Sequence, residues 1–358
     1  MKSTSNRLRF ACLACATATL AACGGGSSTA ETNTSGSSNG AQVAVLPDAS
    51  VVNSIPENIL SLIPSSTYLA GSQEQLVFKF LNAERIRCGF GPLRQDTRLD
   101  RAAKAHARWG VYNQQLSHEE SLTLYPKEFT GMKLTDRALV QGYDGFRLGE
   151  VFSGFNNMPA SASEGIASMR LLLNAPYHMV FMTDAYRDMG VSVQKPADVG
   201  KSSGFDLVMT EFGISQSESY QDWPKDAVLS YPCEGTTGVA YSLNNESPNP
   251  VPGRNLATSP LGASIIFRVR RDQVLSIDAV SMIQTTTGAA VVLRPHVGGG
   301  NGMEDVHNDF GTSVAYVAAE APMKPNTSYS VKVSGSNNGA AFTKEFKFST
   351  GDIYLPSF

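Results

Sequence analysis

Apolar positions recur at helical spacing in three segments of the chain. The first is EQLVFKFLNAERIRC, residues 74–88, and a capping-box pair that begins with Ser72 stands at its start. The second is TRLDRAAKAHARWGVYNQQ, residues 97–115, and Asp96 is placed to cap its first turn. The third runs from Glu164 to Leu173. The pattern therefore predicts three helices in this part of the chain.

Two strand-like runs follow these helices. They are DMGVSVQ, residues 188–194, and FDLVMTEFG, residues 205–213. An order in which helices come first and strands last is typical of an α+β fold, not of a wound βα repeat. We therefore predict an α+β protein whose first folded domain, residues 56–232, is built as α-β-α layers.

Beyond Cys233 the pattern changes to short strands separated by Gly, Asn and Pro. The strand-like runs are ASIIFRVRR (263–271), AVVLRP (290–295), SVAYVAAEA (313–321), SYSVKV (328–333) and FTKEFKFST (342–350). The Asn338-Gly339 pair between the last two is a strong hairpin signal. Short strands with such turns predict a second, all-β sandwich domain over residues 233–352.

The N-terminal residues predict export and anchoring. Residues 1–22 combine basic side chains, an apolar run and small residues, as a secretory signal does. The end of this run resembles a bacterial lipobox, with Cys23 as the residue that receives lipid. Residues 23–55 are a tether rich in Gly, Ser and Thr, followed by a lead-in. Gly24 and not Asp follows the cysteine, and by resemblance to Gram-negative sorting this implies an outer-membrane lipoprotein that faces the periplasm or the cell surface. The alternative is an ordinary signal peptide in which Cys23 stands by chance.

Charge and cysteine content narrow the partners and the compartment. Cleavage after residue 22 removes three of the 29 basic residues and no acidic ones, which leaves 26 against 32 and a net charge of −6. A mildly acidic chain has no electrostatic footprint for nucleic acid. Apart from the lipidated residue, Cys88 and Cys233 remain, an even pair in an oxidising compartment. Two interpretations stay open: a Cys88–Cys233 disulfide, or two buried thiols.

The five histidines of the chain are the first candidates for chemistry. His106 lies on the alanine-rich face of its helix and is predicted to be a hydrogen-bonded core residue. His296 and His307 lie in the strand-rich part and are predicted to stand in solvated loops. His118 and His178 follow the second and third predicted helices, and Glu150 lies between them in LGEVFSG. We expect these three at element ends, where side chains can converge on a cleft. Such a set suits a divalent metal or acid–base work.

The helical part of the chain resembles the CAP family (cysteine-rich secretory protein, antigen 5 and pathogenesis-related-1), also called SCP-like. The resemblance covers roughly residues 72–215 and rests on LVFKFLNAERIRCGFGPLRQDTRLDRAAKAHARW, then Ser117-His118, Gly149-Glu150, Pro176-Tyr177-His178 and DMGVSV. The chain departs from the bacterial pattern at three places, where the family's Asn, Trp and Ser are replaced by Val151, Leu172 and Ala175.

The resemblance implies that His118, Glu150 and His178 line the central cleft of the family. In some members this cleft binds a divalent metal, often zinc. The family's fourth cleft residue, a second glutamate, has no clean counterpart, although Glu119 and Glu164 are candidates. Loss of one ligand weakens metal affinity, so no certain cofactor follows. Pro176 is predicted to end the third helix and so to turn His178 into the cleft.

The strand-rich part resembles the last strands of bacterial immunoglobulin-like domains in its segment MKPNTSYSVKVSGSNNGAAFTKEFKFSTG. This resemblance implies that the sandwich predicted for residues 233–352 is an immunoglobulin-like domain. Such a module serves as a spacer or an adhesion unit, or only covers and stabilises its neighbour.

Three functions remain open on the sequence. The first is a surface-anchored binding protein that contacts the lipid membrane through Cys23 and whose cleft takes a small lipid-like ligand, a glycan or a metal. The second is a metal-dependent hydrolase or peptidase, with Glu150 as general base and the two histidines as ligands. The third is a purely structural envelope or adhesion protein. The missing second acid and the lack of a partnered nucleophile favour binding over catalysis.

Overall fold

The computed structural model describes residues 58–156 and 163–351, all within one compact unit that spans residues 52–358. The predicted signal peptide (1–22), the tether and lead-in (23–55) and the lipidation residue Cys23 lie outside the described residues. Within the described ranges, none of the helices combines the length and the hydropathy that a membrane span requires.

The first sheet has four strands in the order β1-β3-β4-β2. β1 runs parallel to β3, and the other two neighbouring pairs are antiparallel. The bounds are Arg94–Gln95 for β1, Gly145–Phe155 for β2, Asp188–Gln194 for β3 and Asp206–Ser215 for β4. The strands predicted at 188–194 and 205–213 are therefore the two inner strands, β3 and β4. Burial on both faces explains why their sequences are almost continuously apolar.

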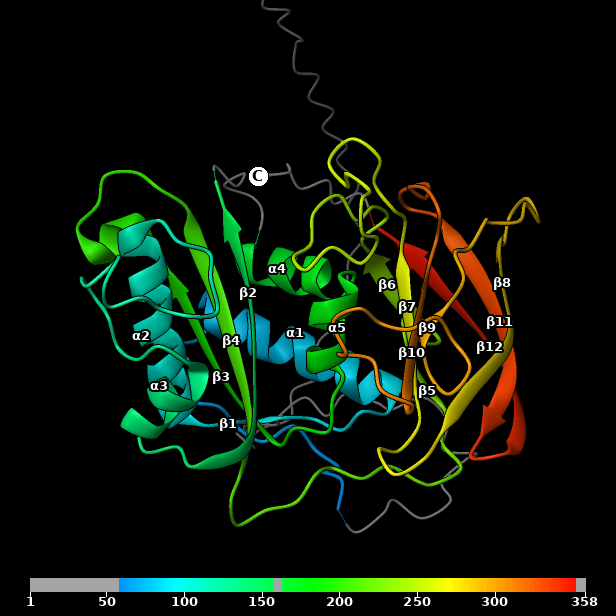
Figure 1. Cartoon of the computed structure of the whole chain (residues 1–358), viewed down its shortest axis with the longest axis horizontal. Coiled ribbons are helices and arrows are strands. Elements are labelled where there is room, and N and C mark those ends of the chain that lie inside the picture. The colour runs from blue at the N-terminus through cyan, green and yellow to red at the C-terminus, as the bar shows by residue number, and fades with distance from the viewer. Residues whose placement is uncertain (1–57, 157–162, 352–358) are drawn as a thin grey trace, which may run out of the picture. The chain divides into compact units, whose positions relative to one another are not determined.

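Helices cover both faces of this sheet (Figure 1). One face carries α2 (Thr97–Asn113) and α3 (Leu134–Val140), and the other carries α1 (Gln73–Cys88), α4 (Glu164–Leu172) and α5 (Pro176–Met182). A short 3-10 turn, η1 (Pro196–Val199), joins β3 to β4. The predicted caps hold, because the Ser72 and Asp96 side chains accept hydrogen bonds from backbone N–H groups in the first turns of α1 and α2. The predicted α+β class and its α-β-α layers are confirmed.

The strand-rich part forms two further four-stranded sheets. One has the order β5-β7-β10-β9 and the other β6-β12-β11-β8. Their bounds are Leu229–Tyr231 (β5), Thr236–Val239 (β6), Ser264–Arg268 (β7), Leu275–Gln284 (β8), Val297–Gly298 (β9), Val314–Ala318 (β10), Ser328–Asn337 (β11) and Ala340–Thr350 (β12). A separate apolar cluster fills the space between the sheets, with Phe267 from one and Val331 and Phe346 from the other. This is a β-sandwich, and its immunoglobulin-like character stays a prediction.

Two details of the sandwich test the sequence patterns. Asn338 and Gly339 form the β11–β12 turn with φ of 50° and 85°, so the predicted hairpin is confirmed. The run 290–295 is not a strand, because only Ala290 and Leu293 make isolated bridges to neighbouring strands. Pro295, which has no N–H to give to a ladder, closes this run.

One apolar core joins the inner helix layer to the first sandwich sheet. It includes Phe78 of α1, Met179 of α5, Ile266 of β7 and Tyr316 of β10. A disulfide between Cys88 and Cys233 links the end of α1 to the segment after β5, across 145 residues of sequence. The domain boundary predicted between residues 232 and 233 stays a prediction. Strand β5 precedes this boundary in sequence, yet it pairs with β7 of the sandwich.

Candidate functional site

Glu150 lies in the middle of β2 and is buried. Its Oε1 atom is 2.8 Å from Nδ1 of His118, which stands in the loop after α2 and whose side chain is half exposed. The His118 ring also packs against Phe152, with 4.6 Å between ring centroids. The expectation that Glu150 stands at an element end is wrong, because the flanking glycines belong to an eleven-residue strand.

Arg137 of α3 supplies the counter-charge of Glu150. Its Nη2 atom is 2.7 Å from Oε2 of Glu150, and its guanidinium also donates to the carbonyl oxygens of His118, Gly131 and Met132. Burial by itself raises the pKa of Glu150. The charge of His106, the hydrogen bond from His118 and the charge of Arg137 outweigh burial and lower the pKa to about 2. An ionised, paired and buried carboxylate is a weak base near neutral pH, so the candidate role of Glu150 as general base does not fit.

His106 and Glu120 hold the loop that carries His118. Nδ1 of His106 is 3.0 Å from Oε1 of Glu120, and its Nε2 is 2.9 Å from the carbonyl oxygen of Ser117. Glu120 also accepts hydrogen bonds from the Thr130 N–H and hydroxyl groups. The ring is 1 % exposed, so the prediction of a hydrogen-bonded core histidine is confirmed. The roles of Glu120 and Arg137 were missed, because residues 116–144 show no strong periodicity.

His178 reaches the cleft from the first turn of α5. Its Nδ1 atom is 3.4 Å from Oε1 of Glu246, which also accepts a 2.7 Å hydrogen bond from the backbone N–H of Tyr177. Burial raises the pKa of Glu246, in spite of the hydrogen bond with His178. Glu246 belongs to the segment between β6 and β7, so the strand-rich part of the chain supplies the carboxylate that contacts His178 in the cleft. No local pattern pointed to Glu246, because its partner is 68 residues away in the chain.

The predicted role of Pro176 is wrong in one respect. α4 ends at Leu172, and Pro176 occupies the first turn of the next helix, α5, instead of stopping the previous one. Proline is well suited to this position, since its ring fixes φ and the first N–H groups of a helix have no intrahelical acceptor. His178 is therefore positioned by a helix start and not by a loop.

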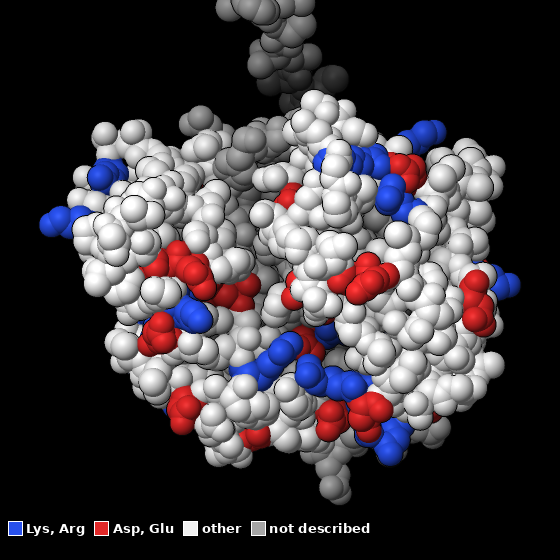
Figure 2. All heavy atoms as spheres, in the orientation of Figure 1, with Lys and Arg blue, Asp and Glu red and all other residues white. Residues whose placement is uncertain are grey.

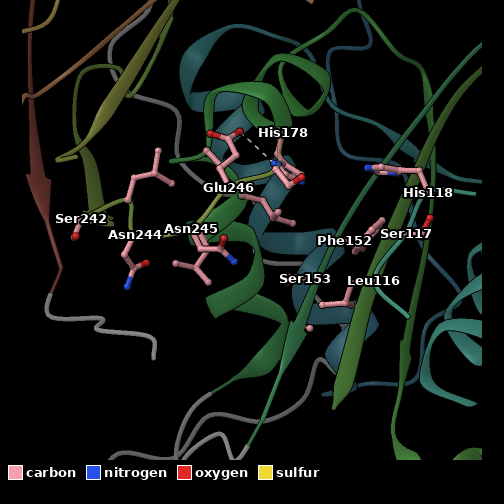
Figure 3. A pocket seen from close by; sticks show the side chains of 16 residues that line it. Leu116, Ser117, His118, Phe152, Ser153, His178, Ser242, Asn244, Asn245 and Glu246 are labelled. Atoms are coloured by element: carbon pink, nitrogen blue, oxygen red, sulfur yellow. Dashed lines mark hydrogen bonds and ion pairs between the residues drawn. The ribbon is translucent and has the colours of Figure 1, made fainter. Parts of the chain in front are cut away.

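The two histidines lie on opposite sides of one hollow. Figure 3 shows the ring of His118 directed across the pocket towards His178, while Glu246 stands behind His178. A cavity of about 420 Å³ and a second cavity of about 450 Å³ adjoin this pair, and both are lined by His118, His178 and Ser247. Glu150 lines the second cavity, so the structure brings all three predicted cleft residues together.

The described residues do not fit a resident metal centre. Among them, no group of three or more His, Cys, Asp or Glu side chains is arranged to hold a metal ion. Glu150 is occupied by Arg137 and His118, and only the two imidazoles remain, whereas zinc sites use three or four protein ligands. The two other candidates add nothing, since Glu164 pairs with Lys195 at 2.7 Å and Glu119 is exposed. The metal set proposed from His118, Glu150 and His178 is therefore not formed.

The two remaining histidines stand outside the cleft. His307 is exposed in the loop after β9, where its ring contacts Tyr177 edge-on. His296 is partly exposed and faces Asn301 across 3.3 Å. Both positions agree with the prediction that these residues belong to solvated loops.

A second carboxyl group, Glu211 of β4, lies opposite Glu150 in the sheet. Glu211 is fully buried, and neither of its oxygen atoms has a hydrogen-bond partner among the described residues. Burial, followed by repulsion from Glu150, raises its pKa well above the ordinary value of 4.5. The folded protein therefore holds a proton on Glu211 that the unfolded chain releases.

We expect Glu211→Gln to stabilise the protein increasingly as the pH rises. A raised carboxyl pKa means that the folded state binds the extra proton above about pH 4.5, so wild-type stability falls by about 1.4 kcal/mol per pH unit until the folded group ionises. Urea unfolding of both proteins between pH 5 and 8 measures this difference. Glu218→Gln is the control, because the hydrogen bond with Arg94 lowers the pKa of Glu218, so this change should destabilise the protein by an amount that does not vary between pH 5 and 8. A difference that is constant with pH would contradict the assignment.

Comparisons with known proteins find no matching family model and no significant match among curated proteins. Among solved structures, an extracellular SCP-domain protein from Bacillus anthracis strain Ames is similar over 39 % of this chain and 40 % of its own length, with 21 % identity and a TM-score of 0.30. An outer surface protein from Borrelia burgdorferi is similar over 42 % of this chain and 97 % of its own, with 15 % identity and a TM-score of 0.32. Both TM-scores are below 0.5, so neither similarity indicates a function for this chain.

Proposed function

We propose that the protein is a cell-envelope binding protein whose cleft takes a small amphipathic ligand, lipid-like or glycan-like. One observation carries this proposal. Two histidines from different segments face each other across a hollow, and each is held through Nδ1 by a buried carboxylate, Glu150 or Glu246. Side chains fixed in this way form a preorganised pair of polar groups, as binding sites require.

The lining of the cavity of about 420 Å³ supports an amphipathic ligand. Leu116, Phe152, Leu171 and Leu243 contribute an apolar wall to the cavity of about 420 Å³. Ser242, Asn244, Asn245 and Glu246 lie on the His178 side of the pocket, whereas His118 lies across from them, beside Leu116 and Phe152 (Figure 3). A pocket with an apolar body and a few convergent polar groups is typical of small-molecule sites. The carboxylates of the walls are buried behind the histidines, so uncharged hydroxyl or amide groups suit the polar side best.

Binding fits this cleft better than hydrolysis. Glu150 has a pKa of about 2 and is paired with Arg137, so it does not accept a proton near neutral pH. Ser117 donates its hydroxyl to the carbonyl oxygen of Glu119 at 2.9 Å and has no base beside it. The described cleft thus offers neither an activated nucleophile nor a three-ligand metal site.

The proposed location follows from the N-terminal residues. Residues 1–22 as a signal peptide, Cys23 as the acylated residue and residues 23–55 as a tether and lead-in would place the folded part at the outer membrane. On this proposal the CAP-like part carries the cleft, and the β-sandwich supplies Glu246 to it. The sandwich is therefore more than a spacer.

We expect His178→Ala and Leu116→Gln each to weaken ligand binding about tenfold, a loss of roughly 1.4 kcal/mol, because they remove one polar and one apolar contact of the same cavity. Fluorescence titration of the purified chain with a fluorescent fatty acid, a fluorescent sterol and a chitin oligosaccharide measures this. Leu124→Gln is the matched control, since Leu124 is 72 % exposed and lies outside the cavity.

The same titrations separate the alternatives. Affinity that survives chelation of divalent metals agrees with the proposal, and affinity that depends on added zinc contradicts the two-histidine geometry described above. Absence of saturable binding for all three probe classes, or an equal loss in Leu124→Gln, would favour the purely structural role.

A further inference from the structure

A second concave site lies where three arginines converge on one aspartate. Arg147 of β2, Arg268 at the end of β7 and Arg271 just after it line a cavity of about 250 Å³ together with Asp184. The carboxylate oxygens of Asp184 are 3.0 Å from Nη2 of Arg147, 3.0 Å from Nη1 of Arg268 and 3.2 Å from Nη1 of Arg271. Among the described residues no histidine lines this cavity, although it shares Phe181 and Asp309 with the neighbouring cleft cavity that Glu150 lines.

The cavity holds more positive charge and more donors than its own acids can satisfy. Three guanidinium groups face two lining acids, Asp184 and Asp309. Each guanidinium has five N–H groups, whereas a carboxylate accepts about four hydrogen bonds. The Nε atoms of Arg147 and Arg268 and the indole nitrogen of Trp223, which also lines the cavity, have no hydrogen-bond partner among the described residues. Donors and charge in excess on a concave surface favour an external anion.

The shape of the donors and the composition of the opposite wall narrow the class of anion. Arginine presents a planar fork that matches the oxygens of phosphate in a bidentate contact, and it does so better than lysine. Val180, Phe181 and Val314 form an apolar wall of the same cavity. Figure 2 shows Lys and Arg side chains gathered with acidic ones around a hollow low on the visible face. An anion with an apolar substituent satisfies both walls.

We propose that this cavity binds a small phosphate monoester, with the phosphate group on Arg147 and Arg271 and the organic group against the apolar wall. Arg147 and Arg271 each keep 37 % of their side-chain surface exposed, so their remaining N–H groups reach a ligand from solution. Arg268 is almost fully buried and fixes Asp184, which in turn aligns the other two arginines.

Titration of the purified full chain with phenyl phosphate at constant ionic strength tests the proposal. Fluorescence of Trp223 and calorimetry both report binding, and we expect phenyl phosphate to bind several-fold more tightly than inorganic phosphate because the apolar wall contributes. Arg147→Gln and Arg271→Gln should each weaken phenyl phosphate binding at least tenfold. Arg270→Gln is the matched control, with less than a twofold effect, because Arg270 pairs with Asp272 and does not line the cavity.

Several results would overturn the proposal. The first is that the wild-type chain does not bind phenyl phosphate in preference to chloride at equal ionic strength. This test needs no variant to fold. The second is an equal loss of affinity in Arg270→Gln and Arg271→Gln, which would indicate only nonspecific electrostatic attraction by the protein surface. The third is that inorganic phosphate binds as tightly as phenyl phosphate, and the fourth is that binding occurs only to vesicles that contain phosphatidic acid. Either of these two results would exclude a small monoester.

Discussion

Replacement of both Cys88 and Cys233 by alanine should lower the free energy of unfolding by about 3–5 kcal/mol. The bridge joins residues that are 145 apart in sequence, so it removes much of the freedom of the unfolded chain. It also connects the end of α1 to the segment after β5, where the inner helices pack against the first sandwich sheet. Equilibrium unfolding in urea, with and without a reducing agent, measures the effect.

The reducing agent provides the internal control. Reduced wild-type protein should unfold at the same denaturant concentration as the double variant, and the double variant should not respond to the reducing agent. If the oxidised wild type and the double variant have equal free energies of unfolding, the bridge does not constrain the chain in solution.

Arg137→Met should destabilise the protein by about 3–5 kcal/mol at neutral pH, since it leaves Glu150 as a buried carboxylate without its cation. The change also strips the donor from the carbonyl oxygens of His118 and Met132. Methionine keeps most of the volume, so the loss reports on charge and hydrogen bonds more than on packing. Urea unfolding gives the free energy, and fluorescent-ligand titration gives the accompanying loss of cleft affinity.

The pH dependence identifies Glu150 as the affected group. Its pKa is lowered to about 2 from the ordinary 4.5, so its stabilising contribution is present above about pH 4.5 and is lost as the pH falls towards 2. The gap between wild type and Arg137→Met should therefore shrink over this acidic range, because a protonated Glu150 no longer needs a counter-charge. Arg101→Met, which removes an exposed arginine that contacts Gln141, is the control and should cost less than about 1 kcal/mol. A gap that is the same at all pH values would assign the loss to packing.

The candidate site combines elements that local patterns predict with elements that they do not. The resemblance to the CAP family identified His118, Glu150 and His178, and these three do line one cleft. The pattern of residue types carries no information on the neighbours of a carboxylate, so it did not reveal that Arg137 pairs with Glu150, a contact that disfavours the possible metal set and base role. Arg137 on α3 pairs with Glu150, and Glu246, which belongs to the strand-rich part of the chain, pairs with His178.

The sequence by itself determined the parts of this protein that depend on near neighbours. Helical and strand periods, the caps at Ser72 and Asp96, and the Asn338-Gly339 turn depend on contacts within a few residues. The three helices, the two inner strands, both caps and the turn appear as predicted, whereas the run 290–295 does not form a strand. The α+β class follows from the order of these elements. The even cysteine count left a disulfide and two free thiols equally open, and the structure contains the disulfide.

Only the tertiary structure decided which charges meet. The contacts of His178 with Glu246 and of Arg268 with Asp184 span 68 and 84 residues, and no period or spacing links such positions. They arise because the first sandwich sheet packs on the inner helix layer and brings β7 and the segment before it against α5. Burial and neighbouring charges then set the electrostatics. The pKa of Glu150 is lowered beside the charges of His106, His118 and Arg137, whereas the pKa of Glu211, which has no hydrogen-bond partner among the described residues, is raised.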